Sequence, residues 1–372
     1  MNGTRILRIY HSGVVDEYRE RERLLRTRHG YDVQLVCPPS WMEGGSVVEA
    51  TPDPEVPLHV VPLRGLRQPN LFWYATSALR RVLREVRPQI VDLHEEPHSL
   101  AAAVALRTIQ VEAPGAPICI YTAQNIFKRY PPPFWHLTRR ALAAAAAAYP
   151  CSTEAGEVLR AKGFKGPLHV LPLGVSLDPE PVPRAGNGHV RVGFLGRLVP
   201  EKGTDVAVQA FARAADGIDA SLEMVGAGPQ EAELRACAER LGVGARVSFP
   251  GAVTQDEALE RIRGYDAVLV PSLTTRRWKE QYGRVAAQAL AAGTPVIASD
   301  SGSLPEVLGD CGELTREGDV DDLSVKLGRL LRDPAHRADL AARGRRRAVE
   351  ELSWARVADG CDQMYRQVLG RV

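Results

Sequence analysis

The chain has 372 residues, which is long for a single hydrophobic core, so about two domains are expected. Its 47 basic and 45 acidic side chains leave a formal net charge of only +2. This balance lacks the strongly basic surface that DNA- and RNA-binding proteins present, so nucleic acid is not expected as a partner.

The cysteines and the apolar segments bear on where the protein works. Six cysteines lie at positions 37, 119, 151, 237, 311 and 361 without Cys-x-x-Cys spacing, and we predict reduced, mostly buried thiols. The first apolar run, RILRIY, is followed at once by the charged run DEYRERERLLR, unlike a signal peptide. The run ALAAAAAAYP is about half as long as a membrane helix, so we interpret it as an Ala-rich packed helix. A cytoplasmic protein is expected.

In the first half of the chain, short β-branched runs alternate with helix-length amphipathic segments. The predicted strands are RILRIY, DVQLV, LHVVPL, QIVDL, ICIYT and LHVLPL. Such alternation is typical of βαβ units around a parallel sheet. After a segment rich in proline and glycine, 178–188, the pattern resumes with VRVGFLG, ASLEMVG, RVSFPG, AVLVPS and PVIAS. We therefore predict an α/β chain with two Rossmann-like, doubly wound parallel-sheet domains, 1–178 and 186–353.

Three further helices are predicted to close the chain, beginning near Asp321, Pro334 and Trp354. The sequence DVDD, 319–322, contains an Asp-x-Asp pair that resembles a metal site. Acidic residues at a helix start more often cap the helix and favour its dipole. We interpret DVDD as a cap and expect no metal.

Ligands bind to open parallel sheets outside the carboxyl ends of the strands, and two such sheets facing one another form a cleft. The strand VRVGFL is followed by GRLVPEKGTD, in which Gly196 permits a tight turn. Arg197 and Lys202 then flank a loop that enters a helix near Gly203. Two cations beside helix amides suit a diphosphate, although two solvated surface charges would give the same sequence pattern.

Two glycine motifs also follow strands. LEMVGAGP places Gly226 and Gly228 in a turn, but Glu231 stands where the dinucleotide fingerprint has its third glycine. The first strand ends in HSGVVDEY with the single glycine Gly13. A nicotinamide cofactor is therefore not supported, and we predict no cofactor.

The segment WKEQYGRVAAQALAAGTPVIAS is predicted to run from a charged loop into a helix and then a buried strand. Gly293 suits the position after a helix end, and Pro295 cannot continue the helix. Glu280 lies in the loop, and Gln288 lies one turn inside the helix. The first turn of this helix is where chemistry is expected.

These motifs in order resemble the retaining glycosyltransferases of family 4, which have the GT-B fold. The matching run is GRLVPEKG, VGAGP, VSFPGAV, PS at 271–272, Glu-x-Tyr-Gly with its Ala-rich helix, AAGTPVIAS and SWARVADGCDQMYRQVL. It covers nearly all of 168–372, while the first half agrees in strand pattern. The resemblance implies metal-independent transfer of a sugar from a nucleoside diphosphate sugar, UDP- or GDP-linked, to a hydroxyl with retained configuration. It also implies that the first domain holds the acceptor and that helix 354–372 packs back on it.

The resemblance further implies roles for single residues. Arg197 and Lys202 would stabilise the departing diphosphate, and Glu280 would accept hydrogen bonds from the donor sugar. The second glutamate of the family motif, which holds the ribose, is replaced here by Gln288, whose amide oxygen can still accept from a hydroxyl. The remaining donor-binding candidates are Gly13, Gly196, Gly226, Gly228, Val253, Gly283, Arg284 and Val285.

On the acceptor side, the sequence departs from many relatives. They carry a histidine just after the strand ICIYT, where this chain has Gln124 and Asn125, neither of which carries protons near neutral pH. The donor phosphate or another side chain must then take the acceptor proton. Candidates after neighbouring strands are His94, Glu95, Glu96, His11 and Ser12, each of which could instead cap or solvate a turn.

Other functions remain open at this point. A sugar-nucleotide epimerase uses the same architecture, and a sugar-nucleotide sensor would need an output segment that the sequence does not show. Acceptor candidates are a lipid-linked sugar, a cyclitol or aminocyclitol, and a secondary-metabolite aglycone. KRYPPPFWHLTRR and RRWKE could line an acceptor channel or touch a membrane surface peripherally, but solvated loops explain them equally well.

Overall fold

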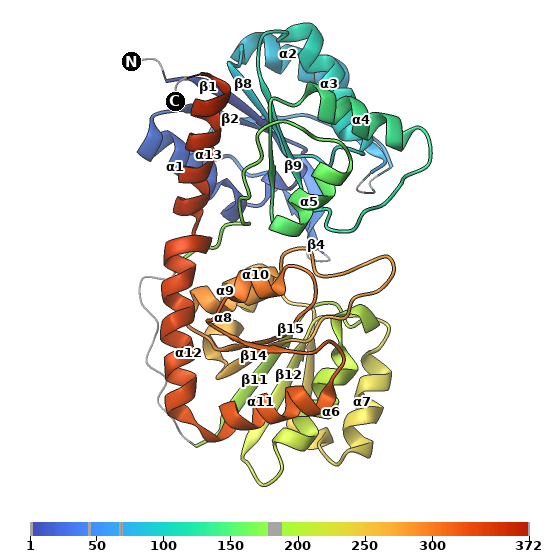
Figure 1. Ribbon diagram of the computed structural model, residues 1–372, viewed down its shortest axis with the longest axis vertical. Helices are drawn as coiled ribbons and strands as arrows, with labels where there is room; N and C mark the ends of the chain where they lie inside the picture. The colour runs from blue at the N-terminus through green and yellow to red at the C-terminus, as the bar shows by residue number, and fades with distance from the viewer. Residues whose placement is uncertain (1–2, 44–45, 67, 69, 178–187, 371–372) are drawn as a thin grey trace. The chain divides into compact units, whose positions relative to one another are not determined.

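The computed structural model describes residues 3–43, 46–66, 68, 70–177 and 188–370. The chain divides into unit 1, Met1–Gly174 with Trp354–Val372, and unit 2, Val175–Ser353 (Figure 1). Each unit is built on one six-stranded sheet, and the prediction of two doubly wound parallel sheets is confirmed. The proline- and glycine-rich segment predicted as a linker lies, apart from Gly188, outside the described residues.

Unit 1 has a parallel sheet with the order β10-β9-β8-β1-β2-β5. Its strands are β1 (Arg5–Ile9), β2 (Asp32–Cys37), β5 (Leu58–Val60), β8 (Ile90–Leu93), β9 (Ile118–Thr122) and β10 (Ala147–Pro150). Two hairpins accompany the sheet, β3 (Ser40–Glu43) with β4 (Ser46–Glu49) and β6 (Leu63–Gly65) with β7 (Phe72–Tyr74). Because β2 and β8 lie on opposite sides of β1, the winding reverses between β1 and β8. This is a switch point, where ligands bind to such sheets.

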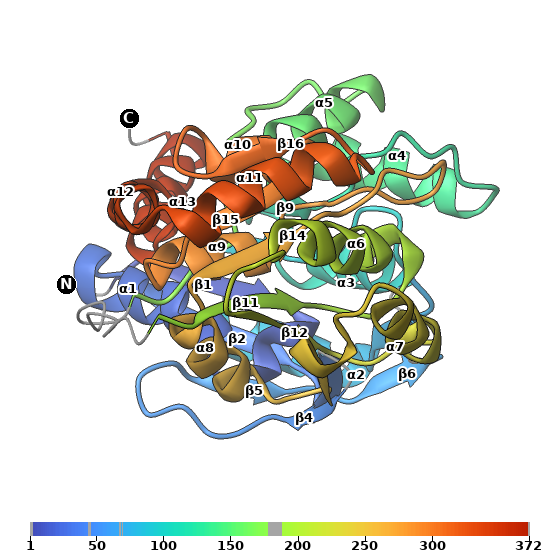
Figure 2. The same ribbon diagram turned by 90° about the horizontal axis from the view of Figure 1, so that it is seen from below.

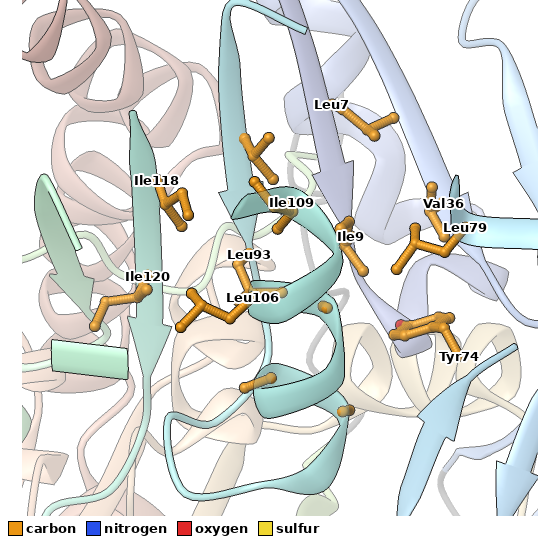
Figure 3. Packing of buried hydrophobic residues seen from close by; sticks show 14 of the residues in the cluster. Leu7, Ile9, Val36, Tyr74, Leu79, Leu93, Leu106, Ile109, Ile118 and Ile120 are labelled. Carbon is orange, nitrogen blue, oxygen red and sulfur yellow. The ribbon is translucent and has the colours of Figure 1, made fainter. Parts of the chain in front are cut away.

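The helices of unit 1 are α1 (Glu20–His29), α2 (Thr76–Val86), α3 (Leu100–Glu112), α4 (Phe134–Ala144), α5 (Thr153–Ala161) and α13 (Trp354–Val368). Ser99 caps α3 by accepting a hydrogen bond from the Ala102 amide at 3.0 Å. Figure 3 shows Leu106 of α3 beside Leu93 of β8 and Ile120 of β9 in the buried core. This packing fixes the strand ends on which the candidate residues stand.

The last helix, α13, lies beside α1 within unit 1 (Figure 1). Its Tyr365 hydroxyl donates to Asp92 of β8 at 2.6 Å, and Tyr31 donates to Asp362 at 2.7 Å. Two further contacts join α13 to the same unit, His29 with Asp359 at 3.0 Å and His169 with Gln367 at 2.7 Å. Polar bonds to a buried strand therefore tie the end of the chain to the first sheet.

Unit 2 has a parallel sheet with the order β13-β12-β11-β14-β15-β16. Its strands are β11 (Val190–Leu195), β12 (Ala220–Val225), β13 (Val247–Gly251), β14 (Ala267–Val270), β15 (Val296–Ser299) and β16 (Glu313–Thr315). Its helices are α6 (Thr204–Ala214), α7 (Glu231–Arg240), α8 (Gln255–Gly264), α9 (Arg284–Ala291), α10 (Leu304–Leu308), α11 (Val320–Arg332) and α12 (Pro334–Arg347). Figure 2 shows α6 and α11, which pack together over this sheet. The switch point of unit 2 lies between β11 and β14.

Two secondary-structure predictions in unit 1 are wrong. The run ALAAAAAAYP is not one helix, because α4 ends at Ala144 and Ala147–Pro150 form β10. All four residues of β10 are buried beside β9, so tertiary packing overrides the helix propensity of alanine. LHVLPL, 168–173, is not a regular strand but follows β10 through single hydrogen bonds, such as that from the Leu171 amide to the Pro150 carbonyl at 3.0 Å. Prolines in both segments lack the N–H groups of a continuous ladder.

Several local predictions are confirmed. Gly293 follows α9 with φ of +66°, and Asp319 caps α11 by accepting from the Asp322 amide at 2.8 Å. The three closing helices begin at Val320, Pro334 and Trp354. All six cysteines are free thiols, and five are buried. Apart from these predictions, none of the helices within the described residues is long and apolar enough to span a membrane, and these residues contain no cluster of three metal-ligating side chains, which leaves the expectation of a metal-independent protein untested.

Candidate functional site

A pocket of about 120 Å³ lies at the switch point of unit 2. Its walls come from the carboxyl-terminal residues of β11 and β14, where the winding of the sheet reverses. Besides these strand residues, the pocket is lined by Lys202, Ser272, Glu280, Gly283, Arg284 and Val285. Five of these six are predicted donor-binding or catalytic residues, and Ser272 is the addition.

A lysine and a glutamate are paired in this pocket. The Lys202 ammonium lies 2.7 Å from Glu280 Oε2, and the Ser272 hydroxyl donates to the same oxygen at 2.7 Å. The ammonium also lies 4.8 Å from the centre of the Trp278 ring, a cation–π contact. Gly203 follows Lys202 with φ of +64°, and a Cβ there would lie 1.9 Å from the Pro271 carbonyl oxygen. The turn that presents Lys202 thus requires glycine.

Helix α9 begins at the same pocket. Gly283 caps the helix with φ of +85°, a conformation that favours glycine. The following amides, Arg284 and Val285, belong to the first turn, where N–H groups have no partner within the helix and the helix dipole is positive. A pocket with an ammonium group and a helix N-terminus suits an anion.

Glu280 and Gln288 are both buried, with 8 % and 9 % of their surfaces exposed. The loop after β15 fixes the Glu280 backbone, because the Ser303 amide donates to the Glu280 carbonyl at 3.1 Å. A Cβ at Gly302 would lie 2.0 Å from that carbonyl oxygen. Gln288 lies in the second turn of α9, and among the described residues its amide has no side-chain hydrogen bond. Glu280 is therefore held in place, whereas the side-chain amide of Gln288 is available for a hydrogen bond to a ligand.

The structure explains other predicted residues of unit 2 by backbone packing. Gly226 has φ of +136°, and its Cβ would lie 1.9 Å from the Gly196 carbonyl oxygen. A Cβ at Gly228 would lie 2.2 Å from the Leu198 carbonyl oxygen. These glycines are needed by the loops whether or not a ligand binds. Arg197 does not line the pocket, since its side chain is 63 % exposed beside Glu201, and Val253 does not line it either.

At the switch point of unit 1, the second residue after β1 contacts the second residue after β8. His11 Nδ1 lies 2.8 Å from Glu95 Oε2, and the His11 backbone amide donates to Glu95 Oε1 at 3.0 Å. The Tyr74 hydroxyl donates to the same Oε1 at 2.6 Å. Burial lowers the pKa of His11, but the charge and hydrogen bond of Glu95, with the charges of Glu43 and Glu96, outweigh it and raise that pKa. His11 and Glu95 were predicted to lie after strand ends, but nothing in the sequence pointed to Tyr74.

His94 is held differently. Its Nδ1 lies 3.0 Å from Arg8 Nη2 and 3.0 Å from the Tyr149 hydroxyl, and its ring stacks on Tyr121 at 3.7 Å between centres. A guanidinium group only donates, so Nδ1 must carry the lone pair and the ring proton sits on Nε2. Neutral His94 is therefore a hydrogen-bond donor through Nε2. Only long-range contacts place Arg8 there, and the sequence shows no sign of them.

A buried network of charges next to His94 connects β1, α1, β8 and α13. Arg8 bonds Glu22 at 2.6 Å, and Arg21 bonds Glu22 at 2.7 Å and Asp92 at 2.6 Å. Burial raises the pKa of Asp92, but Arg21 and Arg8, with hydrogen bonds from two tyrosines, hold it below its ordinary value. This network fixes the Arg8 guanidinium against the His94 ring.

The other acceptor-side candidates are engaged nearby. Glu96 accepts from the Thr122 hydroxyl at 2.7 Å and the Ala123 amide at 2.8 Å, while burial raises its pKa. The remaining contacts are Gln124 with Tyr130 and Lys162, Asn125 with Glu154, and Ser12 with Glu43. Gly13 is buried, with its carbonyl accepting from Arg19 at 2.8 Å, and a Cβ would lie 2.9 Å from Leu35 Cδ2. These side chains surround the switch point rather than form one cluster.

Comparison with known proteins identifies the family. A family model described as Glycosyltransferase Family 4 matches residues 22–179, and one described as Glycosyl transferases group 1 matches residues 182–347. The chain belongs to glycosyltransferase family 4 and has the GT-B fold.

Among curated relatives, an MMP α-(1→4)-mannosyltransferase of Mycolicibacterium hassiacum is 34 % identical over 209 residues, covering 55 % of this chain and 49 % of the relative. A 2-deoxystreptamine glucosyltransferase of Streptomyces kanamyceticus is 36 % identical over 184 residues, covering 48 % and 46 %. The chain thus spans about half the length of the curated relatives it matches. Among solved structures, Anabaena HepE in complex with UDP superposes with a TM-score of 0.73 at 15 % identity, covering 98 % of this chain and 100 % of HepE. The curated relatives are named as transferases, and HepE shares the fold. The epimerase alternative is therefore not favoured.

Proposed function

We propose that the protein transfers a sugar from a nucleoside diphosphate sugar to a hydroxyl acceptor, with retention of the anomeric configuration. The observation that carries this proposal is the pocket of unit 2, where Lys202, Glu280 and the first turn of α9 meet. The ammonium and the helix amides suit a diphosphate, and the carboxylate suits sugar hydroxyls. Retention rests on the family resemblance of this motif.

In the proposed reaction, the bond from the anomeric carbon to the diphosphate breaks while negative charge grows on the phosphate. A fixed cation next to that charge stabilises the transition state more than the ground state. Lys202 is such a cation, since Glu280 holds its ammonium at 2.7 Å. Glu280 would orient the sugar, and Gln288 would accept a hydrogen bond from the ribose.

A covalent route through Glu95 or Glu96 is not part of the proposal. Glu95 accepts three hydrogen bonds, two from His11 and one from Tyr74. Glu96 accepts two within 2.8 Å. A carboxylate with its oxygens occupied in this way is a poor nucleophile, so attack of the acceptor on the face from which the diphosphate leaves is the simpler route to retained configuration.

For the donor, UDP- and GDP-sugars are both candidates. HepE was crystallised with UDP, and the names of the relatives given above specify mannosyl and glucosyl transfer. For the acceptor, we propose a small molecule rich in hydroxyl groups, a sugar or a cyclitol, either free or lipid-linked. Unit 1 would bind the acceptor, because its switch point carries carboxylates and histidines that the donor site of unit 2 does not use.

Thermal shift with a panel of nucleotides and nucleotide sugars tests the proposal. A ligand at a hundred times its dissociation constant stabilises the protein by about 2.7 kcal/mol, which is easily measured. We expect one nucleoside diphosphate and its sugar derivatives to raise the melting temperature, and Lys202→Met to abolish the shift. A panel without any shift, or a shift unchanged in Lys202→Met, would contradict the assignment.

A further inference from the structure

One segment of unit 1 carries positive charge without any acidic residue. Between positions 113 and 153 the sequence contains Lys128, Arg129, Arg139 and Arg140 but no aspartate or glutamate. The whole chain has a formal net charge of +2, so the residues outside this segment together carry a net charge of −2. The positive charge of the protein is therefore concentrated in one short segment.

Helix α4 presents part of this charge on its outer face. Three of its side chains are buried in unit 1: Thr138, Ala141 and Leu142. On the other side of the helix, His136, Arg139 and Arg140 are exposed and Trp135 is partly exposed. Side chains four positions apart lie on the same face of a helix, so Trp135 is a neighbour of Arg139. The outer face of α4 is thus both basic and aromatic.

The loop 123–133, which leads from β9 into α4, adds further exposed groups. The Phe127 side chain is 46 % exposed, and Arg129 and the three prolines 131–133 are exposed as well. In both views of the molecule, α4 and this loop lie at the margin of unit 1 (Figures 1 and 2). We define the basic-aromatic surface as the exposed or partly exposed side chains of Phe127, Lys128, Arg129, Trp135, His136, Arg139 and Arg140.

Most of the cations on this surface are not compensated within the protein. Among the described residues, none forms an ion pair or a hydrogen bond with the guanidinium groups of Arg129, Arg139 and Arg140. On α2, by contrast, the exposed Arg84 is paired with Glu112 at 2.7 Å. Uncompensated guanidinium groups together with exposed aromatic rings suit a partner that is anionic on its outside and apolar beneath.

We propose that the basic-aromatic surface docks unit 1 on an anionic lipid bilayer. The cations contact the lipid headgroups, while Phe127 and Trp135 enter the boundary between headgroups and acyl chains, where aromatic rings are favoured. Helix α4 lies along the bilayer surface in this arrangement. The inference goes beyond the proposed transfer reaction and does not depend on it.

Nucleic acid fits this surface less well than a bilayer does. A nucleic-acid site often contacts about 6–10 phosphates, whereas the segment offers four cations and the rest of the chain is net negative. An acidic protein would pair with the cations but gives no reason for exposed rings among them. Binding to either partner in place of lipid is an outcome of the experiments below.

Sedimentation with sucrose-loaded vesicles tests the proposal on the full chain. One set of vesicles is phosphatidylcholine alone, and the other is an equimolar mixture of phosphatidylcholine and phosphatidylglycerol. We expect the protein to sediment with the mixed vesicles and to stay in solution with phosphatidylcholine. Raising the salt from 0.1 M to 1 M shortens the screening length from about 10 Å to about 3 Å, so most of the protein should be released.

A pair of double variants separates this surface from net charge. A basic side chain near an anionic membrane strengthens binding by about fivefold, so Arg139→Gln combined with Arg140→Gln should weaken it by about 25-fold. Arg64→Gln combined with Arg81→Gln is the matched control, because it removes the same charge from exposed arginines of β6 and α2. This control should change binding by about twofold at most. Thermal melting checks that each variant is folded.

Tryptophan fluorescence tests which surface meets the lipid. Trp135 is the one tryptophan between positions 113 and 153, and the others are Trp41, Trp73, Trp278 and Trp354. Mixed vesicles with brominated acyl chains should quench the emission of the wild type. In Trp135→Phe, which keeps an aromatic ring, most of this quenching should be absent although the protein still sediments with the vesicles.

Several results would overturn the proposal. These are equal binding to both kinds of vesicle, no binding to either, equal losses in the two double variants, or undiminished quenching in Trp135→Phe. Tighter binding to a duplex DNA oligonucleotide or to polyglutamate than to the mixed vesicles would also overturn it. Because no nucleotide sugar is present in these assays, their failure leaves the proposed transfer reaction untouched.

Discussion

The different tasks of Glu280 and Gln288 give the most specific prediction for unit 2. Glu280→Gln keeps the shape of the side chain and an oxygen for the Ser272 bond but removes the charge that pairs with Lys202 at 2.7 Å. A hydrogen bond to a charged group contributes about 1.5–3 kcal/mol, so kcat should fall by about 10- to 150-fold. The affinity for the bare nucleoside diphosphate should change little, because Glu280 is assigned to the transferred sugar.

Gln288→Ala should behave in the opposite way. Its amide is assigned to the ribose, which stays with the leaving product, so donor and nucleoside diphosphate should both bind more weakly. The loss of one buried hydrogen-bond partner costs about 1–2 kcal/mol, or about 5- to 30-fold in Kd, with a smaller effect on kcat. Gln288→Glu should be tolerated, since a carboxylate also accepts from a hydroxyl. Gln209→Ala, in the partly buried part of α6, is a matched control that should leave the affinities unchanged.

Isothermal titration with nucleoside diphosphate and with intact donor, combined with steady-state rates, separates the two roles. If Glu280→Gln loses affinity for the nucleoside diphosphate while Gln288→Ala keeps it, the assignment of the two side chains is refuted.

Three further outcomes are expected. Lys202→Met should lower kcat/KM by roughly 100-fold, as for a lost transition-state cation. Lys326→Met, at an ion-paired lysine of similar exposure, should change kcat/KM by about twofold at most, and equal losses in steady-state assays would contradict the assignment. Tyr365→Phe should reduce the free energy of unfolding by about 1–3 kcal/mol, because it leaves buried Asp92 without one donor, and urea denaturation showing no loss would argue against a structural role for this contact. EDTA should not change turnover, and a strict need for Mg²⁺ or Mn²⁺ would show that the metal-independent mechanism is wrong.

Sequence patterns predicted the sheets and their ligand-binding ends well, because these follow from local periodicity. The motif around Glu280 was found because glycines, a helix start and a buried strand occur in one continuous segment. Its partner Lys202 lies 78 residues away, and only the parallel topology, which brings the ends of β11 and β14 together, explains why they meet.

Other features were beyond local reasoning. The residues of β10 favour a helix by composition, and their burial beside β9 decides otherwise. The tautomers of His11 and His94 depend on Glu95 and Arg8, which are 84 and 86 residues distant in the chain. Two histidines that look equivalent as strand-end residues are therefore given different chemistry by partners that only the fold supplies.

Proton NMR of the first sugar released from an α-linked donor tests the central claim most directly. The protein is incubated with UDP-α-glucose or GDP-α-mannose, with water or a polyol as acceptor, and the anomeric signal of the product is recorded before mutarotation. The account predicts that the product appears first as the α anomer, detached from the nucleotide. A β anomer as the first product, or an altered sugar still attached to its nucleotide, would contradict it.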